Sequence, residues 1–123
     1  MLYFVLEEFS SPDLPGSGSL MNAEFLALLD KARGEAGIPF KITSGFRTPE
    51  YQKDLTRRGY KTARNSAHLK GLAADIAVTS SENRLIIIEA LLFVGFRRVG
   101  ISMGNFIHVD ADPTKSQDVI WTY

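Results

Sequence analysis

Hydrophobic residues recur at helical spacing in three segments of the chain, which predicts three helices. Each begins after a side chain that can accept a hydrogen bond from a free backbone N–H group, and each ends near a glycine. The predicted capping groups and closing glycines are Asn22 with Gly37, Thr48 with Gly59, and the capping-box pair Thr79 and Glu82 with Gly95. The third helix, "RLIIIEALLFVG", is mostly apolar, so we expect it to be buried.

Apolar runs between these helices predict strands. The predicted strands are "MLYFVLEEF", "IPFKIT", "LAADIAV" and the pair "RRVGIS" and "FIHVDAD", which a short "MGN" turn joins. Residues 10–19, rich in Ser, Pro and Gly, indicate a surface loop. This order favours a small α+β domain, with a mostly antiparallel sheet flanked by helices, over a parallel doubly wound sheet.

Composition limits the number of domains and the classes of partner. The chain has 123 residues, 45% of them hydrophobic and 23% charged, which suits a single domain over residues 1–123 with a real core. Its net charge of zero provides no basic surface for a phosphate backbone, so we expect no nucleic-acid partner. There is no cysteine, so any metal must be held by histidines and carboxylates.

The apolar stretches are too short for targeting or for crossing a membrane. The first run has six residues, no basic segment before it and two glutamates after it, unlike a signal peptide. Glu89 interrupts the apolar third helix, which is also too short to span a bilayer. We therefore expect a monomer without a membrane span that is made in the cytoplasm.

Two of the predicted strands place chemically active side chains on one face. Alternate residues of a strand share a face, so His108 and Asp110 lie together. The same rule places Asp75 beside the small residues Ala73 and Ala77. An ionised carboxylate on a mostly buried strand is unfavourable unless it is paired or coordinated. We therefore expect Asp75 to face a cavity or a metal.

The chain has only two histidines, His68 and His108, and with Asp75 they supply three nitrogen and oxygen ligands. A catalytic zinc site uses three such ligands and leaves its fourth position to water. Taken singly, His108 and Asp75 are more often hydrogen-bonded structural residues. However, the pattern S-x-H-x-x-G-x-A-x-D in "SAHLKGLAAD" arises by chance in a chain of this length on the order of one time in ten thousand. The combination favours a metal site.

The segments "SGFRTPEY", "SAHLKGLAAD" and "HVD", in this order and at these separations, resemble the M15 metallopeptidases. This D-alanyl-D-alanine carboxypeptidase-like family includes phage endolysins and cell-wall endopeptidases. The resemblance covers about residues 40–110 and implies the hedgehog/D,D-peptidase-like fold of the family. The site residues it implies are the zinc ligands His68, Asp75 and His108 and the substrate-binding residues Arg47 and Ser66. Local sequence alone would equally allow Arg47 a surface ion pair or a helix cap.

The sequence departs from this family at the general base. Many members carry a glutamate three residues before the last ligand or a histidine two before it, where this chain has Asn105 and Phe106. Asp110 is the predicted base, because the "HVD" ending resembles a subset of the family with an aspartate there. Its alternative role is to orient His108, and Asp112 is a second candidate for the base.

Two further features are predicted to lie near the site. The charged segment "RRGYKTAR", residues 57–64, predicts a loop at the rim of the cleft. Trp121 could line the cleft or cover the core, and we expect it to pack in the core.

Together these features predict a zinc-dependent peptidase that cuts peptidoglycan stem peptides at or near D-amino acid bonds, as a D,D-carboxypeptidase or an endopeptidase. Zinc would activate water and Asp110 would take its proton. Arg47 would hold a substrate carboxylate or stabilise the oxyanion. The alternatives are a catalytically inactive zinc-containing module that binds the cell wall or a protein, and a structural domain without metal. To act on the wall, the protein would need a holin, another export route or cell lysis, as a phage-encoded lysin does.

Overall fold

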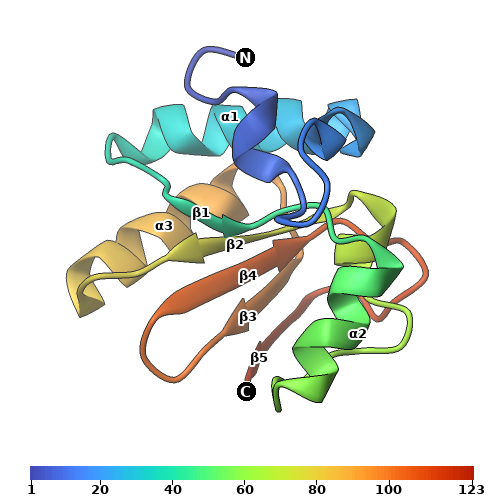
Figure 1. Ribbon diagram of the computed structural model, residues 1–123. Helices are drawn as coiled ribbons and strands as arrows, with labels where there is room; N and C mark the ends of the chain where they lie inside the picture. The colour runs from blue at the N-terminus through green and yellow to red at the C-terminus, as the bar shows by residue number, and fades with distance from the viewer.

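The computed structural model describes residues 1–123 and contains one five-stranded sheet with the strand order β1-β2-β4-β3-β5 (Figure 1). The strands are Ile42–Ser44 (β1), Ala73–Ala77 (β2), Arg98–Ile101 (β3), Phe106–Asp110 (β4) and Val119–Thr122 (β5). Neighbouring strands are antiparallel except β3 and β5, which are parallel. The predicted α+β class with a mostly antiparallel sheet is confirmed.

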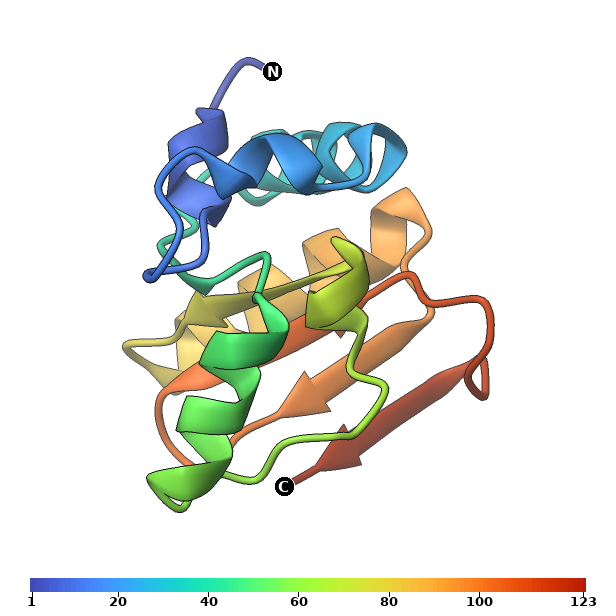
Figure 2. The same cartoon turned by 45° about the vertical axis from the view of Figure 1, so that its right-hand side comes forward.

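Three α-helices surround the sheet: Ala23–Ala36 (α1), Pro49–Arg57 (α2) and Ser81–Val94 (α3). Helices α1 and α3 pack against each other on one face of the sheet, and α2 lies on the other side (Figure 2). Three short 3-10 helices, Leu6–Phe9 (η1), Ser17–Leu20 (η2) and Ala67–Lys70 (η3), complete the elements. None of the helices combines the length and the apolar character needed to cross a membrane.

Most of the predicted helix caps are present. Asn22 and Thr48 accept hydrogen bonds from backbone N–H groups in the first turns of α1 and α2. The predicted capping box of α3 is wrong by one residue, because Ser80 is the N-cap and accepts from the Asn83 N–H at 3.1 Å. The hydroxyl of Thr79 accepts instead from the side-chain amide of Asn83.

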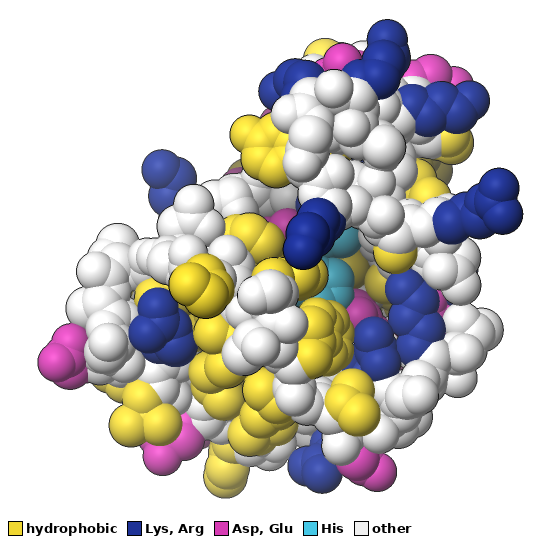
Figure 3. All heavy atoms as spheres, turned by 90° about the horizontal axis from the view of Figure 1, so that it is seen from below, with side chains coloured by type: hydrophobic (Ala, Val, Ile, Leu, Met, Phe, Trp, Pro, Cys, Tyr) yellow, Lys and Arg dark blue, Asp and Glu magenta, His cyan; other side chains and the backbone are white.

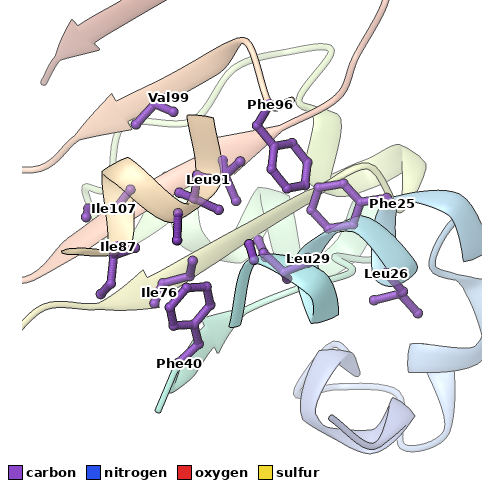
Figure 4. Close-up of a cluster of buried hydrophobic side chains, with 14 of the residues drawn as sticks. Phe25, Leu26, Leu29, Phe40, Ile76, Ile87, Leu91, Phe96, Val99 and Ile107 are labelled. Atoms are coloured by element: carbon purple, nitrogen blue, oxygen red, sulfur yellow. The ribbon is translucent and has the colours of Figure 1, made fainter. Parts of the chain in front are cut away.

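The core lies between the sheet and the α1–α3 layer, where Phe25, Leu29, Ile87 and Leu91 meet the apolar face of the sheet (Figure 4). Strand alternation decides which side chains enter it. The inward side chains of β2 and β4 are all fully buried: Ala74, Ile76, Ile107 and Val109. Burying one such large aliphatic side chain stabilises the fold by about 1.5–3 kcal/mol. The same alternation directs the polar side chains of these strands to the face opposite α1 and α3.

The predicted opening strand is wrong. Residues of this segment form η1, and Phe4 and Phe9 pack edge to face with 5.3 Å between their ring centroids. The backbone N–H groups of Leu2 and Tyr3 donate to the carboxylate of Asp30 on α1 instead of to a neighbouring strand. The carboxylate of Glu8 likewise accepts from the Val5 N–H. Side-chain acceptors therefore satisfy backbone groups that a sheet would otherwise pair.

Strand β5 was not predicted. It has four residues, it forms an edge of the sheet, and its only partner is β3. Its placement beyond the β3–β4 hairpin brings Trp121 and Tyr123 beside the polar face of the sheet.

Candidate metal centre

The centre is built where β2 and β4 pair, with Asp75 directly opposite His108. Helix η3 adds His68 to the same point. One ligand atom from each of the three residues lies within 4.8 Å of the others, and all three residues are buried. The Oδ1 atom of Asp75 is 3.3 Å from His68 Nε2 and 3.1 Å from His108 Nδ1. The structure thus brings together the three residues that the sequence analysis selected as ligands.

The local sequence of "SAHLKG" explains how His68 reaches this position. Ser66 is the N-cap of η3, and its hydroxyl accepts a hydrogen bond from the His68 N–H at 3.2 Å. Gly71 ends η3 with a positive φ of 71°, and a Cβ atom there would lie 2.6 Å from the carbonyl oxygen of Leu20. The carbonyl group of His68 also accepts from the Arg47 N–H at 3.1 Å. Ser66 therefore supports the centre and also lines the cleft.

Each histidine has one ring nitrogen fixed by a partner outside the cluster. His68 Nδ1 lies 2.8 Å from the carbonyl oxygen of Gly45, which can only accept, so this nitrogen carries the proton. In the neutral ring, Nε2 then presents its lone pair toward Asp75. His108 Nε2 lies 2.8 Å from Asp110 Oδ2, which leaves Nδ1 for the cluster. Histidine ligands of metals are commonly oriented in this way by a carbonyl or carboxylate.

The electrostatic environments of the two histidines differ. Burial lowers the pKa of His68 more than nearby Asp75 raises it. Burial also opposes the charged form of His108, but its hydrogen bonds to Asp110 and Asp75 raise its pKa above the ordinary value. The two histidines hold the pKa of Asp75 well below its usual range, although burial works against ionisation. When protonated, His108 therefore donates from Nδ1 to Asp75 and from Nε2 to Asp110, so the two carboxylates favour a positive charge between them.

The donor set fits zinc. Two imidazole nitrogens and one carboxylate oxygen are ligands that zinc accepts, and three protein ligands are the number found in catalytic sites. The second partner of each imidazole fixes the ring so that the other nitrogen faces the cluster. Oδ2 of Asp75 is held at 3.2 Å by Arg47.

Arg47 lies between β1 and α2 and is fixed by three side chains. It donates from Nε to Ser44 Oγ at 2.9 Å, from one terminal nitrogen to Gln52 Oε1 at 3.1 Å, and from the other to Asp75. Gln52 in turn donates to the carbonyl oxygen of Ala63 in the rim loop at 3.0 Å. Gln52 was not identified from the sequence, because a glutamine on a helix gives no signal of what it will contact.

Asp110 lies behind His108, and both of its oxygens are engaged. Oδ2 contacts His108, and Oδ1 accepts from Arg98 Nε at 2.7 Å and from the Asp112 N–H at 3.1 Å. The residue is only 2% exposed. Asp112, the second candidate for the base, does not line the cleft and pairs with Lys70 at 2.8 Å.

The centre lies at the base of a cleft with a volume of about 820 Å³. Helix α2 and the following loop form one side, and β5 forms the other. Figure 3 shows the histidines in a hollow bordered by basic and hydrophobic side chains. The rim loop was predicted, and its lining residues are Arg58, Tyr60, Lys61, Thr62 and Ala63. The expectation that Trp121 packs in the core is wrong, because its ring lines the cleft 5.5 Å from the His108 ring.

The fold and the site define a small α+β protein with a candidate metal centre at the base of a cleft. The family model described as Peptidase M15 matches residues 3–110, so the chain belongs to the M15 peptidase family. This confirms the resemblance noted in the sequence. A search of curated proteins finds no match. Strand β5 lies outside the matched region.

Proposed function

We propose that this protein is a zinc-dependent peptidase that hydrolyses peptidoglycan stem peptides at or near D-amino acid bonds, as a D,D-carboxypeptidase or an endopeptidase. The observation that carries the proposal is the convergence of His68, Asp75 and His108 at the base of an open cleft. Membership of the M15 peptidase family supports the same reaction class.

The ligand atoms in this proposal are His68 Nε2, His108 Nδ1 and Asp75 Oδ1. Bound zinc would supply a water molecule of near-neutral pKa and polarise the scissile carbonyl. Arg47 has five N–H donors, and three of them are used by Ser44, Gln52 and Asp75. The remaining two would bind a carboxylate or carbonyl oxygen of the substrate, and Ser66 would contact the substrate beside them.

The contacts of Asp110 favour a positioning role over that of a general base. A base must reach the attacking water with a free lone pair. Both oxygens of Asp110 are instead occupied, by His108 on one side and by Arg98 and a backbone N–H on the other. We propose that Asp110 orients His108, and its predicted role as the base stays a prediction.

A second candidate function is a zinc-containing module that binds wall peptides or a protein without turnover. One observation favours it: Asp75 and Asp110 are the only carboxylates that line the cleft, and all four of their oxygens have partners. This arrangement would bind a peptide near the metal without providing a free base.

The deciding experiment combines metal analysis with digestion of purified peptidoglycan. We expect about one zinc per molecule, as for a site with three protein ligands, and release of stem-peptide fragments detected by mass spectrometry. His108→Ala should lose most of its zinc and all peptide release. Asp118→Asn is the matched surface control, because Asp118 is exposed and pairs only with Arg97.

The possible outcomes of this experiment distinguish the peptidase from the binding module and test the metal centre. Zinc binding and wall binding without any released fragment would replace the peptidase by the binding module. A parent without zinc, or a His108→Ala variant with full zinc occupancy, would overturn the metal centre.

A further inference from the structure

Strand β5 places two aromatic rings along the edge of the cleft. Trp121 is in register with Gly100 of β3, and the Tyr123 N–H donates to the carbonyl oxygen of Ile101 at 3.1 Å. Alternate residues of a strand share a face, so Trp121 and Tyr123 both project toward the cleft. Both residues line it.

Small side chains on β3 let these rings extend toward the centre. A Cβ atom on Gly100 would lie 2.8–2.9 Å from atoms of the indole, so the ring of Trp121 lies directly over that glycine. Ser102, which directly follows β3, also lines the cleft. The Tyr123 ring lies 5.7 Å from the ring of Phe106, which belongs to β4 on the other side of β3. Tyr123 therefore spans one strand to reach the strand that carries His108.

The phenol of Tyr123 lies within the electrostatic reach of the centre. Tyr123 is 48% exposed, but the partial burial of its phenol raises its pKa to about 12. The negative charges of Asp75 and Asp110 act in the same direction, whereas Arg47 opposes them. The hydroxyl therefore stays protonated at neutral pH and can donate a hydrogen bond. Phe106, against which the ring packs, cannot donate or accept a proton.

Tyr123 and Arg47 approach the centre from opposite edges of the sheet. Arg47 follows β1 at one edge, Tyr123 follows β5 at the other, and the ligands on β2 and β4 lie between them. A substrate carbonyl bound above the ligands would have donors on both sides. Because Tyr123 lies beyond the matched residues 3–110, membership of the family gives it no role.

We propose that Tyr123 is a catalytic residue whose phenol O–H donates a hydrogen bond to the oxyanion that forms on the scissile carbonyl of the peptide. The inference rests on the proposed peptidase function. A fixed donor of this kind stabilises the tetrahedral intermediate more than the planar substrate, so it acts on kcat more than on KM.

The test compares Tyr123→Phe with the parent protein and with Tyr3→Phe. Tyr3 does not line the cleft, and its ring stacks on Arg33, so this control removes the same hydroxyl group outside the site. The substrate is a soluble cross-linked muropeptide released from sacculi by a muramidase. We expect Tyr123→Phe to keep its zinc content and KM and to lose about a hundredfold in kcat, and Tyr3→Phe to match the parent.

A second measurement separates this role from a loss of packing. A D-alanyl-D-alanine analogue with a phosphinate at the scissile position carries the charge and shape of the tetrahedral intermediate. By calorimetry, Tyr123→Phe should bind it about a hundredfold more weakly than the parent, whereas the affinity for the released product stays the same.

The outcomes distinguish the two proposals. An active parent whose Tyr123→Phe variant keeps the parental kcat and phosphinate affinity overturns the role of Tyr123 and leaves the peptidase intact. A parent that contains zinc but cleaves no muropeptide overturns both.

Discussion

At the scale of one residue, the hydrogen-bond partners of Asp110 limit the chemical role that its carboxylate can have. Its carboxylate joins the His108 ring to the guanidinium of Arg98, which is itself 8% exposed and covered by the Trp121 ring at 4.8 Å. Buried charges in such a chain are stabilised only while each keeps its partner. The geometry therefore links His108, a proposed ligand, to Asp110, Arg98 and Trp121.

Asp110→Asn tests this role. Asparagine can still accept a hydrogen bond from His108, but it leaves the charge of Arg98 without its carboxylate. We expect zinc affinity to fall by about 10- to 100-fold, the usual effect of losing a partner that orients a metal ligand. The measurement is competition with a chelator, followed by kcat at saturating zinc. Unchanged zinc affinity with a hundredfold or greater loss of kcat would instead identify Asp110 as the base.

The residues of the centre differ in how far the sequence predicts them. His68 and Asp75 lie in the pattern S-x-H-x-x-G-x-A-x-D, whereas the roles of His108 and Arg47 rest largely on the resemblance to the M15 family. The groups that hold these side chains in position by hydrogen bonds could not be predicted in this way. The acceptor for His68 is the backbone carbonyl of Gly45, which has no signature in the sequence, and Gln52 reaches Arg47 only once α2 has packed. Arg98 meets Asp110 across the β3–β4 hairpin.

At the scale of the elements, β5 depends on a single glycine. Gly100 lies between Trp121 and His108 in the register of the sheet, and the indole occupies the space that a Cβ atom would need. Because the indole is a rigid ring packed between its neighbours, it cannot move aside without losing its contacts with His108 and Arg98.

Gly100→Ala should therefore destabilise the fold by about 1–3 kcal/mol, the usual effect of inserting a methyl group into a packed site. Denaturant unfolding measures the loss, and the fluorescence of the only tryptophan reports the displaced ring. Trp121→Phe has a smaller ring, so the double variant should lose less stability than the two single variants added together. Additive losses would show that the close contact at Gly100 does not limit β5.

The elements that the sequence predicted well are those whose signals are local. Helix periods and capping residues determine α1, α2 and α3, and strand alternation determines which faces of β2 and β4 are apolar. The predicted opening strand was wrong because the apolar residues of this segment pack with α1. The carboxylate of Asp30 on α1 accepts hydrogen bonds from the backbone N–H groups of Leu2 and Tyr3. Strand β5 was not predicted because its hydrogen bonds depend on β3, from which β4 separates it in the chain. A local sequence pattern does not reveal such a parallel pairing.

At the scale of the whole molecule, the sheet separates two environments. One face is covered by α1 and α3 and holds the apolar core, whereas the other carries the candidate ligands and is open to the cleft. The candidate ligands come from two parts of the chain that are far apart in sequence: His68 on η3 and Asp75 on β2 belong to one, and His108 on β4 to the other. Asp112 connects these segments. Its carboxylate lies 2.8 Å from Lys70 Nζ at the end of η3 and accepts from the backbone and hydroxyl of Thr114 in the turn after β4.

This connection predicts a specific dependence of stability on pH. Asp112 is fully buried, which opposes ionisation, but its hydrogen bonds to Lys70 and Thr114 lower its pKa from 3.8 to about 2. A carboxyl group whose pKa is lowered in the folded state stabilises that state above the pKa of the unfolded chain. The contribution is fully present above pH 3.8 and is lost as the pH falls through about 2.

Asp112→Asn should therefore be less stable than the parent at pH 6, by about 1–3 kcal/mol for the loss of hydrogen bonds to a buried carboxylate. This difference should shrink steadily between pH 3.8 and about 2, because the parent then also loses the charge. Urea unfolding of both zinc-free proteins across this range measures it, and the other acidic residues titrate equally in the two. A difference in unfolding free energy that stays constant down to about pH 2 would mean that the ionised Asp112–Lys70 pair does not stabilise the junction between η3 and β4.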